Sequence, residues 1–389
     1  MRLSLVLIAA AALAASGCNL GDPEARQPQI AGDDALEAGE QLGLPWGVTR
    51  NTVRVGGEDA AADAAGVARA LFPSPASGER PTAVALVDQA DWQTAVAASV
   101  LAGPPIAAPL LLADGDELPE ATASALDDLD PSGSDLTRDR QVIRVGPDVA
   151  IPEGFSTARI GGADPFARAA AIDRFSAAAR GEASNDVVLY SAERPEWAMP
   201  AASWAARSGD AALPVRANGV PTPIVEALRD HERPNVYLLG PETVIGEEVA
   251  ARLRRGRLAR AVRRIEAPTA VENAIAFARY ERGDFGWGVV VPGYNFAVAS
   301  TSRPADAAAA ASLATRGVFA PLLLTDRAEA LPEPLESYLL SVQPGYEQDP
   351  AQAVYNRAWI IGDTEAISVR QQAQIDQVTE LIPVQVNAP

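Results

Sequence analysis

Arginines are the residues of this chain whose type and spacing best suit ligand binding. The chain contains no lysine, so every Lys/Arg-type cation is an arginine, and seven of them lie within thirteen residues. A guanidinium group binds phosphate or carboxylate through parallel hydrogen bonds, so the cluster suits an anionic polymer or lipid headgroups. The alternative is a solvated helix and linker whose arginines pair with Glu247, Glu248 and other acids. The seven are Arg252, Arg254, Arg255, Arg257, Arg260, Arg263 and Arg264.

Three arginines recur at a fixed interval. Arg54, Arg159 and Arg264 are 105 residues apart, each in a short apolar segment, and glycine pairs follow the first two. Self-similarity at such a long period indicates tandem domains rather than a solenoid. Near a threefold axis these three arginines could form a shared anion site. The pattern favours a structural role, in which each holds carboxylates or carbonyls of a neighbouring unit.

The other residue types leave little room for catalysis. Cys18 is the one cysteine and His231 the one histidine, which excludes an intrachain disulfide, Cys/His zinc sites and most His-based mechanisms. We therefore expect no enzyme, no cofactor and no catalytic residue. Trp92 and Trp197 could stack on sugars, although aromatic residues on Ala-rich helices usually fill cores.

An acidic stretch partly fits a calcium-binding loop. Its oxygen-bearing residues stand at positions one, three, five and twelve, with glycine at six. An internal proline and an aspartate in place of the bidentate glutamate weaken the match, so we expect an acidic surface loop and no metal. The residues are Asp128, Asp130, Ser132, Gly133 and Asp139.

Length and charge limit the possibilities further. A chain of 389 residues fits two or three domains, and its 48% hydrophobic content is ample for packed cores. Aromatic residues make up only 5%, so Ala, Val, Leu and Ile must build those cores. A net charge of −19 argues against nucleic-acid binding, which needs a basic face.

The N-terminus is predicted to be a lipoprotein signal peptide, residues 1–17. An apolar segment too short to span a bilayer ends in Ala15-Ser16-Gly17-Cys18, which resembles the bacterial lipobox. Cys18 would then be lipidated. The alternative is an ordinary secretory signal with a chance cysteine. Residues 18–48 are polar and rich in turn residues, so we expect a flexible tether.

The rest of the chain alternates short apolar strands with helices. In the first repeat we expect a helix over Asp59–Phe72 and a strand over Ala83–Val87, and in the third a strand over Val289–Val291. This alternation predicts an α/β fold of three tandem Rossmann-like units with mostly parallel sheets. The predicted repeats cover residues 49–155, 156–261 and 262–389.

The pattern resembles the cell-wall-binding repeat type 2 family. The Arg-containing strand, the Pro-Leu-Leu-Leu strand and the closing segments GPDVAI, GPETVI and GDTEAI carry the likeness. Gly293-Tyr294-Asn295-Phe296-Ala297 matches the family's Asn-Phe-Ala stretch, with Trp92 and Trp197 as its aromatic equivalents. On this alignment the family's following aspartate is replaced by Thr94, Met199 and Val298.

The resemblance implies three units packed around a pseudo-threefold axis that hold an anionic wall polymer such as a teichoic-type one. The chain would be a non-catalytic lipoprotein on the outer face of the cytoplasmic membrane, within the cell wall. The predicted polymer contacts are the three repeated arginines with Arg252, Arg254, Arg255, Arg257 and Arg260. Two alternatives stay open, namely a solute-binding lipoprotein of a transporter and a structural or partner-binding envelope scaffold.

Overall fold

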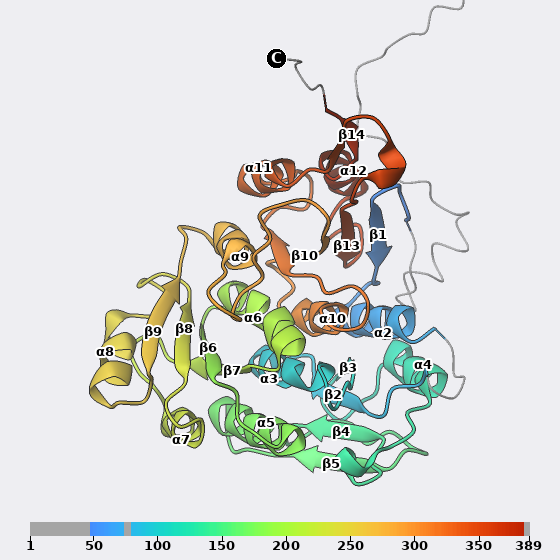
Figure 1. Ribbon diagram of the computed structural model, residues 1–389. Helices are drawn as coiled ribbons and strands as arrows, with labels where there is room; N and C mark the ends of the chain where they lie inside the picture. The colour runs from blue at the N-terminus through green and yellow to red at the C-terminus, as the bar shows by residue number, and fades with distance from the viewer. Residues whose placement is uncertain (1–46, 74–78, 385–389) are drawn as a thin grey trace, which may run out of the picture.

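The computed structural model describes residues 47–73 and 79–384. Within them, three four-stranded parallel sheets alternate with helices, which confirms the predicted α/β fold of tandem Rossmann-like units (Figure 1). The first two sheets have the orders β3-β2-β4-β5 and β7-β6-β8-β9. Their strands are β2 Val84–Asp88, β3 Leu110–Ala113, β4 Val142–Val145, β5 Thr157–Ile160, β6 Asp186–Ser191, β7 Ala211–Val215, β8 Asn235–Leu239 and β9 Ala261–Ile265.

The third sheet is completed by the first strand of the chain. Its order is β11-β10-β13-β1, and β1 pairs in parallel with β13, with Arg54 opposite Ile360. The segments at the two ends of the described chain thus meet in one sheet and close the three units into a ring. The strands are β1 Thr52–Val55, β10 Asn295–Ser300, β11 Leu322–Thr325 and β13 Arg357–Ile361; a separate pair is β12 Gly345–Tyr346 and β14 Ile382–Pro383.

Each repeated arginine lies on the strand that completes the sheet of the preceding repeat. β5 follows this rule in the first sheet, β9 in the second and β1 in the third. The sheets are therefore offset by one strand from the sequence repeats. Because every repeat gives its first strand to its neighbour, the three units depend on one another for their edges.

Helices cover the sheets on both faces, as parallel strands require. The second helices of the three units, α3, α6 and α10, pack against one another at the centre of the ring (Figure 1). Alanines make this close packing possible, since α10 is DAAAAASL and is buried throughout. The helices are α2 Ala60–Leu71, α3 Trp92–Ala98, α4 Glu120–Leu129, α5 Pro165–Arg180, α6 Pro195–Ser208, α7 Thr222–Asp230, α8 Glu247–Arg255, α9 Ala270–Arg279, α10 Asp306–Leu313, α11 Glu333–Ser341 and α12 Val369–Val378.

Buried ion pairs join the first unit to each of the other two, and the acid and the base exchange places between the two joints. Nine positions after the repeated arginine, the first unit has Asp63, fully buried, in an ion pair with Arg303 of the third. At the same position the second unit has Arg168, which contacts Asp91 of the first at 2.5 Å. This opposite placement of the charges favours one order of units around the ring, because a swapped unit would leave a buried charge unpaired.

Two details of the sequence prediction are wrong. The strand expected over Val289–Val291 is instead β10, six residues later, because a strand needs a partner and only Asn295–Ser300 pairs with β11 and β13. Asn295-Phe296-Ala297 therefore lies in a strand, whereas Trp92 and Trp197 lie in helices. Val298 lies in β10, and the residue of α10 at the position of Thr94 and Met199 is Asp306, so the aspartate expected from the resemblance is present in the third unit.

Candidate functional site

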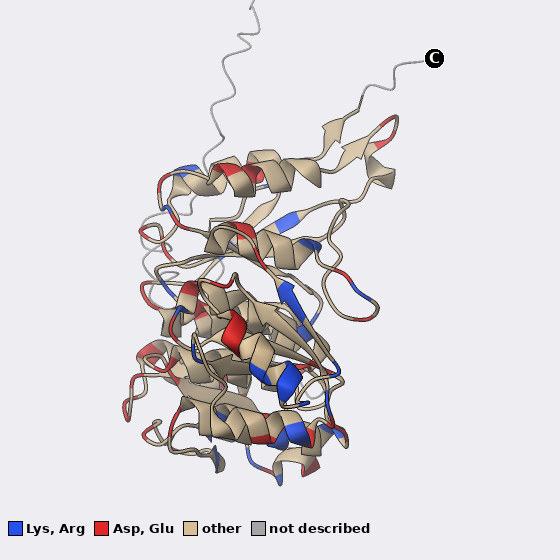
Figure 2. Ribbon diagram, turned by 90° about the vertical axis from the view of Figure 1, so that its left-hand side faces the viewer, with Lys and Arg blue, Asp and Glu red and all other residues tan. Residues whose placement is uncertain are grey.

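The predicted arginine surface lies on α8 and the segment that leads to β9. Figure 2 faces it and shows α8 beginning with acidic and ending with basic residues. Five of its arginines are exposed; Arg254 pairs with Glu247 at 2.6 Å, and the other four form no salt bridge with any residue of the described chain. The five are Arg252, Arg254, Arg255, Arg257 and Arg260. Their guanidinium groups can bind an anion.

The amphipathic pattern of α8 places these side chains in solvent. Val249, Ala250 and Leu253 are buried against the sheet, so the arginines between and after them face outward. Glutamates in the first turn and arginines in the last turn also complement the helix dipole. The same sequence that stabilises the helix therefore concentrates positive charge at its C-terminal end.

Arg54 is enclosed in the fold. Its side chain is fully buried, and it donates hydrogen bonds to the carbonyls of Gly362, Asp363 and Ile367 at 2.6–2.7 Å. Its Nε donates to Gln372 Oε1 of α12 at 3.0 Å. These contacts hold the turn that follows β13 and attach β1 to it.

The other two repeated arginines occupy equivalent strands but differ in burial. Arg264 is mostly buried and donates to the carbonyls of Gly240 and Ile245, at 2.9 and 2.8 Å. Arg159 is exposed, and the neighbouring strand's Arg144 contacts the turn carbonyl of Val149 instead. The structure places the three on separate edge strands and does not bring them together at one site.

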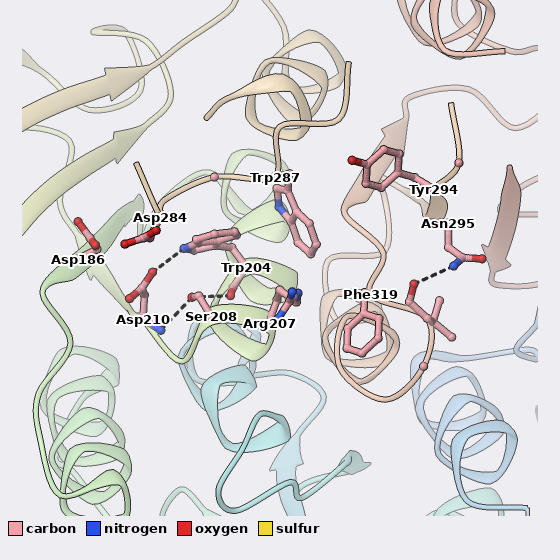
Figure 3. Close-up of a pocket in the computed structure, with 14 residues that line it drawn as sticks. Asp186, Trp204, Arg207, Ser208, Asp210, Asp284, Trp287, Tyr294, Asn295 and Phe319 are labelled. Atoms are coloured by element: carbon pink, nitrogen blue, oxygen red, sulfur yellow. Dashed lines mark hydrogen bonds between the residues drawn. The ribbon is translucent and has the colours of Figure 1, made fainter. Parts of the chain in front are cut away.

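A pocket lies between the second and third units. Its volume is about 610 Å³, and Figure 3 shows its lining. In that view, Trp204, Trp287 and Arg207 lie on one side and Tyr294 and Phe319 on the other. The polar lining residues include Asp186, Asp210, Asp284, Ser208 and Asn295. An apolar cavity of about 400 Å³ adjoins it and shares Arg207, Gly317 and Phe319.

A long loop of the third unit, residues 280–294, forms one wall of the pocket. Phe285 is buried in the second unit, where it stacks on Tyr237 with ring centroids 3.4 Å apart and contacts Trp204 at 4.9 Å. Gly286 follows with φ +107°, and a Cβ there would lie 2.2 Å from the Tyr280 carbonyl oxygen. A side chain at that position would displace the loop, so glycine is required for the wall to form.

The pocket is acidic at one end. Trp204 Nε1 donates to Asp210 Oδ2 at 2.9 Å, and Ser184 donates to the same carboxylate. Burial raises the pKa of Asp210, and these hydrogen bonds oppose the shift. Burial and the nearby Asp186 carboxylate raise the pKa of Tyr237 to about 12, so this tyrosine stays neutral at physiological pH.

Sequence reasoning missed the residues of this pocket. It singled out Trp92 and Trp197, which lie at the starts of α3 and α6, with Trp197 buried in the core. Trp204 and Trp287 are instead the tryptophans that line a cavity. The available signal was the gathering of scarce aromatic residues between Phe277 and Tyr294, in a chain where they form only 5%.

The remaining candidate residues have structural contacts. Asp128 and Asp130 of the acidic loop pair with Arg69 and Arg80. His231 is buried, and its ring nitrogens contact the Asp173 carboxylate and the Ser184 carbonyl. No group of three or more potential metal ligands is found in the described chain. Cys18 and most of the predicted tether lie outside the described residues.

The fold and these sites define a ring of three Rossmann-like units with an arginine-rich face. Residues 264–371 match the family model described as Cell wall binding domain 2 (CWB2), which agrees with the resemblance found in the repeats. The match begins at the repeated arginine of β9 and ends in α12. It therefore follows the sequence repeat rather than the sheet.

Solved structures of the same fold include two proteins of Clostridium difficile. Cwp8 is 19% identical, with a TM-score of 0.64 over 86% of this chain and 52% of that one. Cwp6 is 18% identical, with a TM-score of 0.64 over 87% and 49%. The chain thus spans about half the length of these structures. A search of curated proteins finds no match.

Within residues 47–73 and 79–384, no helix combines the length and the apolar character that a bilayer crossing needs.

Proposed function

We propose that the protein is an exported, non-catalytic component of the cell envelope that binds an anionic glycopolymer of the cell wall. Its arginine surface makes the contacts, and a lipid on Cys18 holds it at the membrane. The observation that carries this proposal is that exposed arginines, four of them without a salt bridge in the described chain, directly precede the Cell wall binding domain 2 match over residues 264–371.

Charge contrast supports the arginine surface as the contact. The protein has a net charge of −19, so an anionic polymer is repelled by most of its surface. At the C-terminal end of α8 and on the segment that follows it, Arg252, Arg255 and Arg260 reverse the sign locally. Binding would therefore be confined to this face, and because exposed charges are screened, it would weaken as salt rises.

The three equivalent units argue against the solute-binding alternative. A transport receptor closes two lobes on its ligand. Here the first unit is joined to each of the other two by a buried ion pair, and all three share a central helix cluster. A partner-binding scaffold without a polymer ligand is the other alternative, and a wall-binding experiment separates it from our proposal.

The test is co-sedimentation of the purified protein with cell walls. Native walls are compared with walls stripped of their phosphate-bearing polymers and with bare peptidoglycan, each at about 50 and 500 mM NaCl. We expect the protein to pellet with native walls at low salt, to pellet far less with stripped walls, and to be released at high salt. Equal pelleting with native and stripped walls would exclude the anionic polymer as the ligand.

A further inference from the structure

The pocket between the second and third units has walls suited to a sugar ring. Trp287, Tyr294 and Phe319 offer apolar faces, and Phe319 is 49% exposed despite its size. Carboxylate, amide and hydroxyl groups complete the lining, with the carboxylates gathered at the end beyond Trp204 (Figure 3). Small-molecule sites likewise use a few polar groups to orient a ligand against apolar walls. Its volume of about 610 Å³ can hold one or two pyranose rings.

The charge of the pocket is opposite to that of the arginine surface. Asp186, Asp210 and Asp284 line it, and Arg207 is the one cation among its lining residues. That guanidinium lies over the Phe319 ring, 5.0 Å from its centroid. Phosphate or carboxylate is disfavoured here, whereas hydroxyl or ammonium groups would find several acceptors.

Strand register places the two sites side by side. Asp186 of β6 pairs with Asn235 of β8, and Asn235 pairs with Ala261 of β9. Adjacent strands are about 4.8 Å apart, so Asp186 in the pocket and Ala261 are separated by roughly 10 Å. Arg260 directly precedes Ala261 and is exposed. Arg260, the end of the arginine surface nearest to β9, therefore lies roughly 10 Å from the pocket along the sheet, about the length of one sugar ring and its linkage.

We infer that the pocket binds a pyranose substituent that carries hydroxyl or amino groups and no negative charge, while Arg260 and its neighbours bind the anionic backbone of the same polymer. This inference rests on the proposed function and names the polymer's chemistry: a phosphate-bearing chain with neutral or amino-sugar branches. Loop 280–294 builds the wall of the pocket, so the specificity belongs to the junction between the second and third units.

The experiment uses the intact protein and three soluble probes, measured by calorimetry. They are oligo(glycerol phosphate) without substituents, with glucosyl substituents and with glucosaminyl substituents. We expect each substituted probe to bind at least about tenfold more tightly than the unsubstituted one, since hydrogen bonds to the carboxylates are charge-assisted. A larger gain for the glucosaminyl probe would assign an ammonium group to the pocket, and a gain for the glucosyl probe alone would assign a neutral sugar.

Two variants test whether the tighter binding of the substituted probes arises in the pocket. Asp284→Asn alters an exposed carboxylate and Trp287→Ala an apolar wall, and Asp116→Asn on an exposed loop of the first unit is the matched control. Both pocket variants should reduce the advantage of the substituted probes, and Arg260→Gln should weaken all three probes alike. If the unsubstituted probe binds through the arginines and substituents add nothing, the inference fails while the proposed function stands. If no probe binds and walls do not pellet the protein, the proposed function fails as well.

Discussion

Arg54 and Arg159 stand at the same place in the repeat, yet the first is fully buried and the second is exposed. The difference comes from what covers the strand. Helix α12 follows β13 and contributes Gln372 to Arg54, whereas no helix lies between β4 and β5, where residues 146–156 connect the strands. Arg264, flanked by α8, is intermediate. A helix that covers the strand, α12 at Arg54 and α8 at Arg264, therefore determines whether the repeated arginine is buried and bonded to the neighbouring unit.

The same comparison separates two classes of arginine. Two of the three repeated arginines, Arg54 and Arg264, donate to backbone carbonyls of the neighbouring unit. Arginines at the end of α8 face solvent without a salt-bridge partner in the described chain, apart from Arg254. The first class stabilises the fold and is unavailable to a ligand, whereas the second costs little stability and can bind.

The largest expected effect is on ring closure. Arg54→Met should destabilise the protein by about 3–5 kcal/mol, because it leaves buried carbonyls and Gln372 without their donor. Arg264→Met should cost less, about 1–2 kcal/mol, since it makes two such bonds and is partly solvated. Arg159→Met should change stability by less than about 0.5 kcal/mol. Urea unfolding of the three variants measures this series, and equal losses at all three positions would contradict the account.

A smaller effect is expected from pH at the joint between the first and third units. Burial raises the pKa of Asp306 to about 6, and burial together with Asp306 raises that of Asp63; Arg303 opposes both shifts. A carboxyl group with a raised folded-state pKa makes the folded state bind more protons, so stability falls as pH rises from about 4 through 6.

His231 adds to this dependence with the same sign. Burial alone would lower its pKa, but the hydrogen bond and charge of Asp173 overcome it and raise the pKa. Its contribution is therefore complete below about pH 6.5 and is lost as pH rises through the folded-state value. Thermal unfolding should give a Tm several degrees higher at pH 5 than at pH 8. Asp306→Asn should reduce that difference, and an unchanged difference would show that the joint does not cause it.

The sequence predicted the repeat and the class of fold because both depend on local patterns. Short apolar strands bounded by Gly and Pro, and Ala-rich helices between them, were recognisable without any partner. The pairing partners of the strands were not recognisable. β1 pairs with β13, about 300 residues away, and no local feature of Thr52–Val55 specifies this pairing. The strand at Asn295–Ser300 was missed for the same reason, since Val289–Val291 is equally apolar.

The two parts of the candidate site, the arginine surface and the pocket, differ in the same way in how far the sequence predicts them. The arginine surface could be predicted from the sequence, because seven arginines within thirteen residues of an acidic chain are evident without a structure. The pocket could not, because Trp204 and Trp287 come from different units and meet through the long loop of the third. Likewise, Asp63 and Arg303 are 240 residues apart, and only the ring brings them into contact.

The most direct test of the central claim compares two triple variants for wall binding and stability. Arg252→Gln/Arg255→Gln/Arg260→Gln removes three charges from the arginine surface, and glutamine keeps helix propensity. Arg140→Gln/Arg327→Gln/Arg370→Gln removes three exposed charges elsewhere. We predict that the first variant loses co-sedimentation with native walls by tenfold or more at an unchanged Tm, and that the second binds like the unaltered protein. Undiminished binding by the first variant, or equal losses in both, would contradict the claim that the arginine surface holds the polymer.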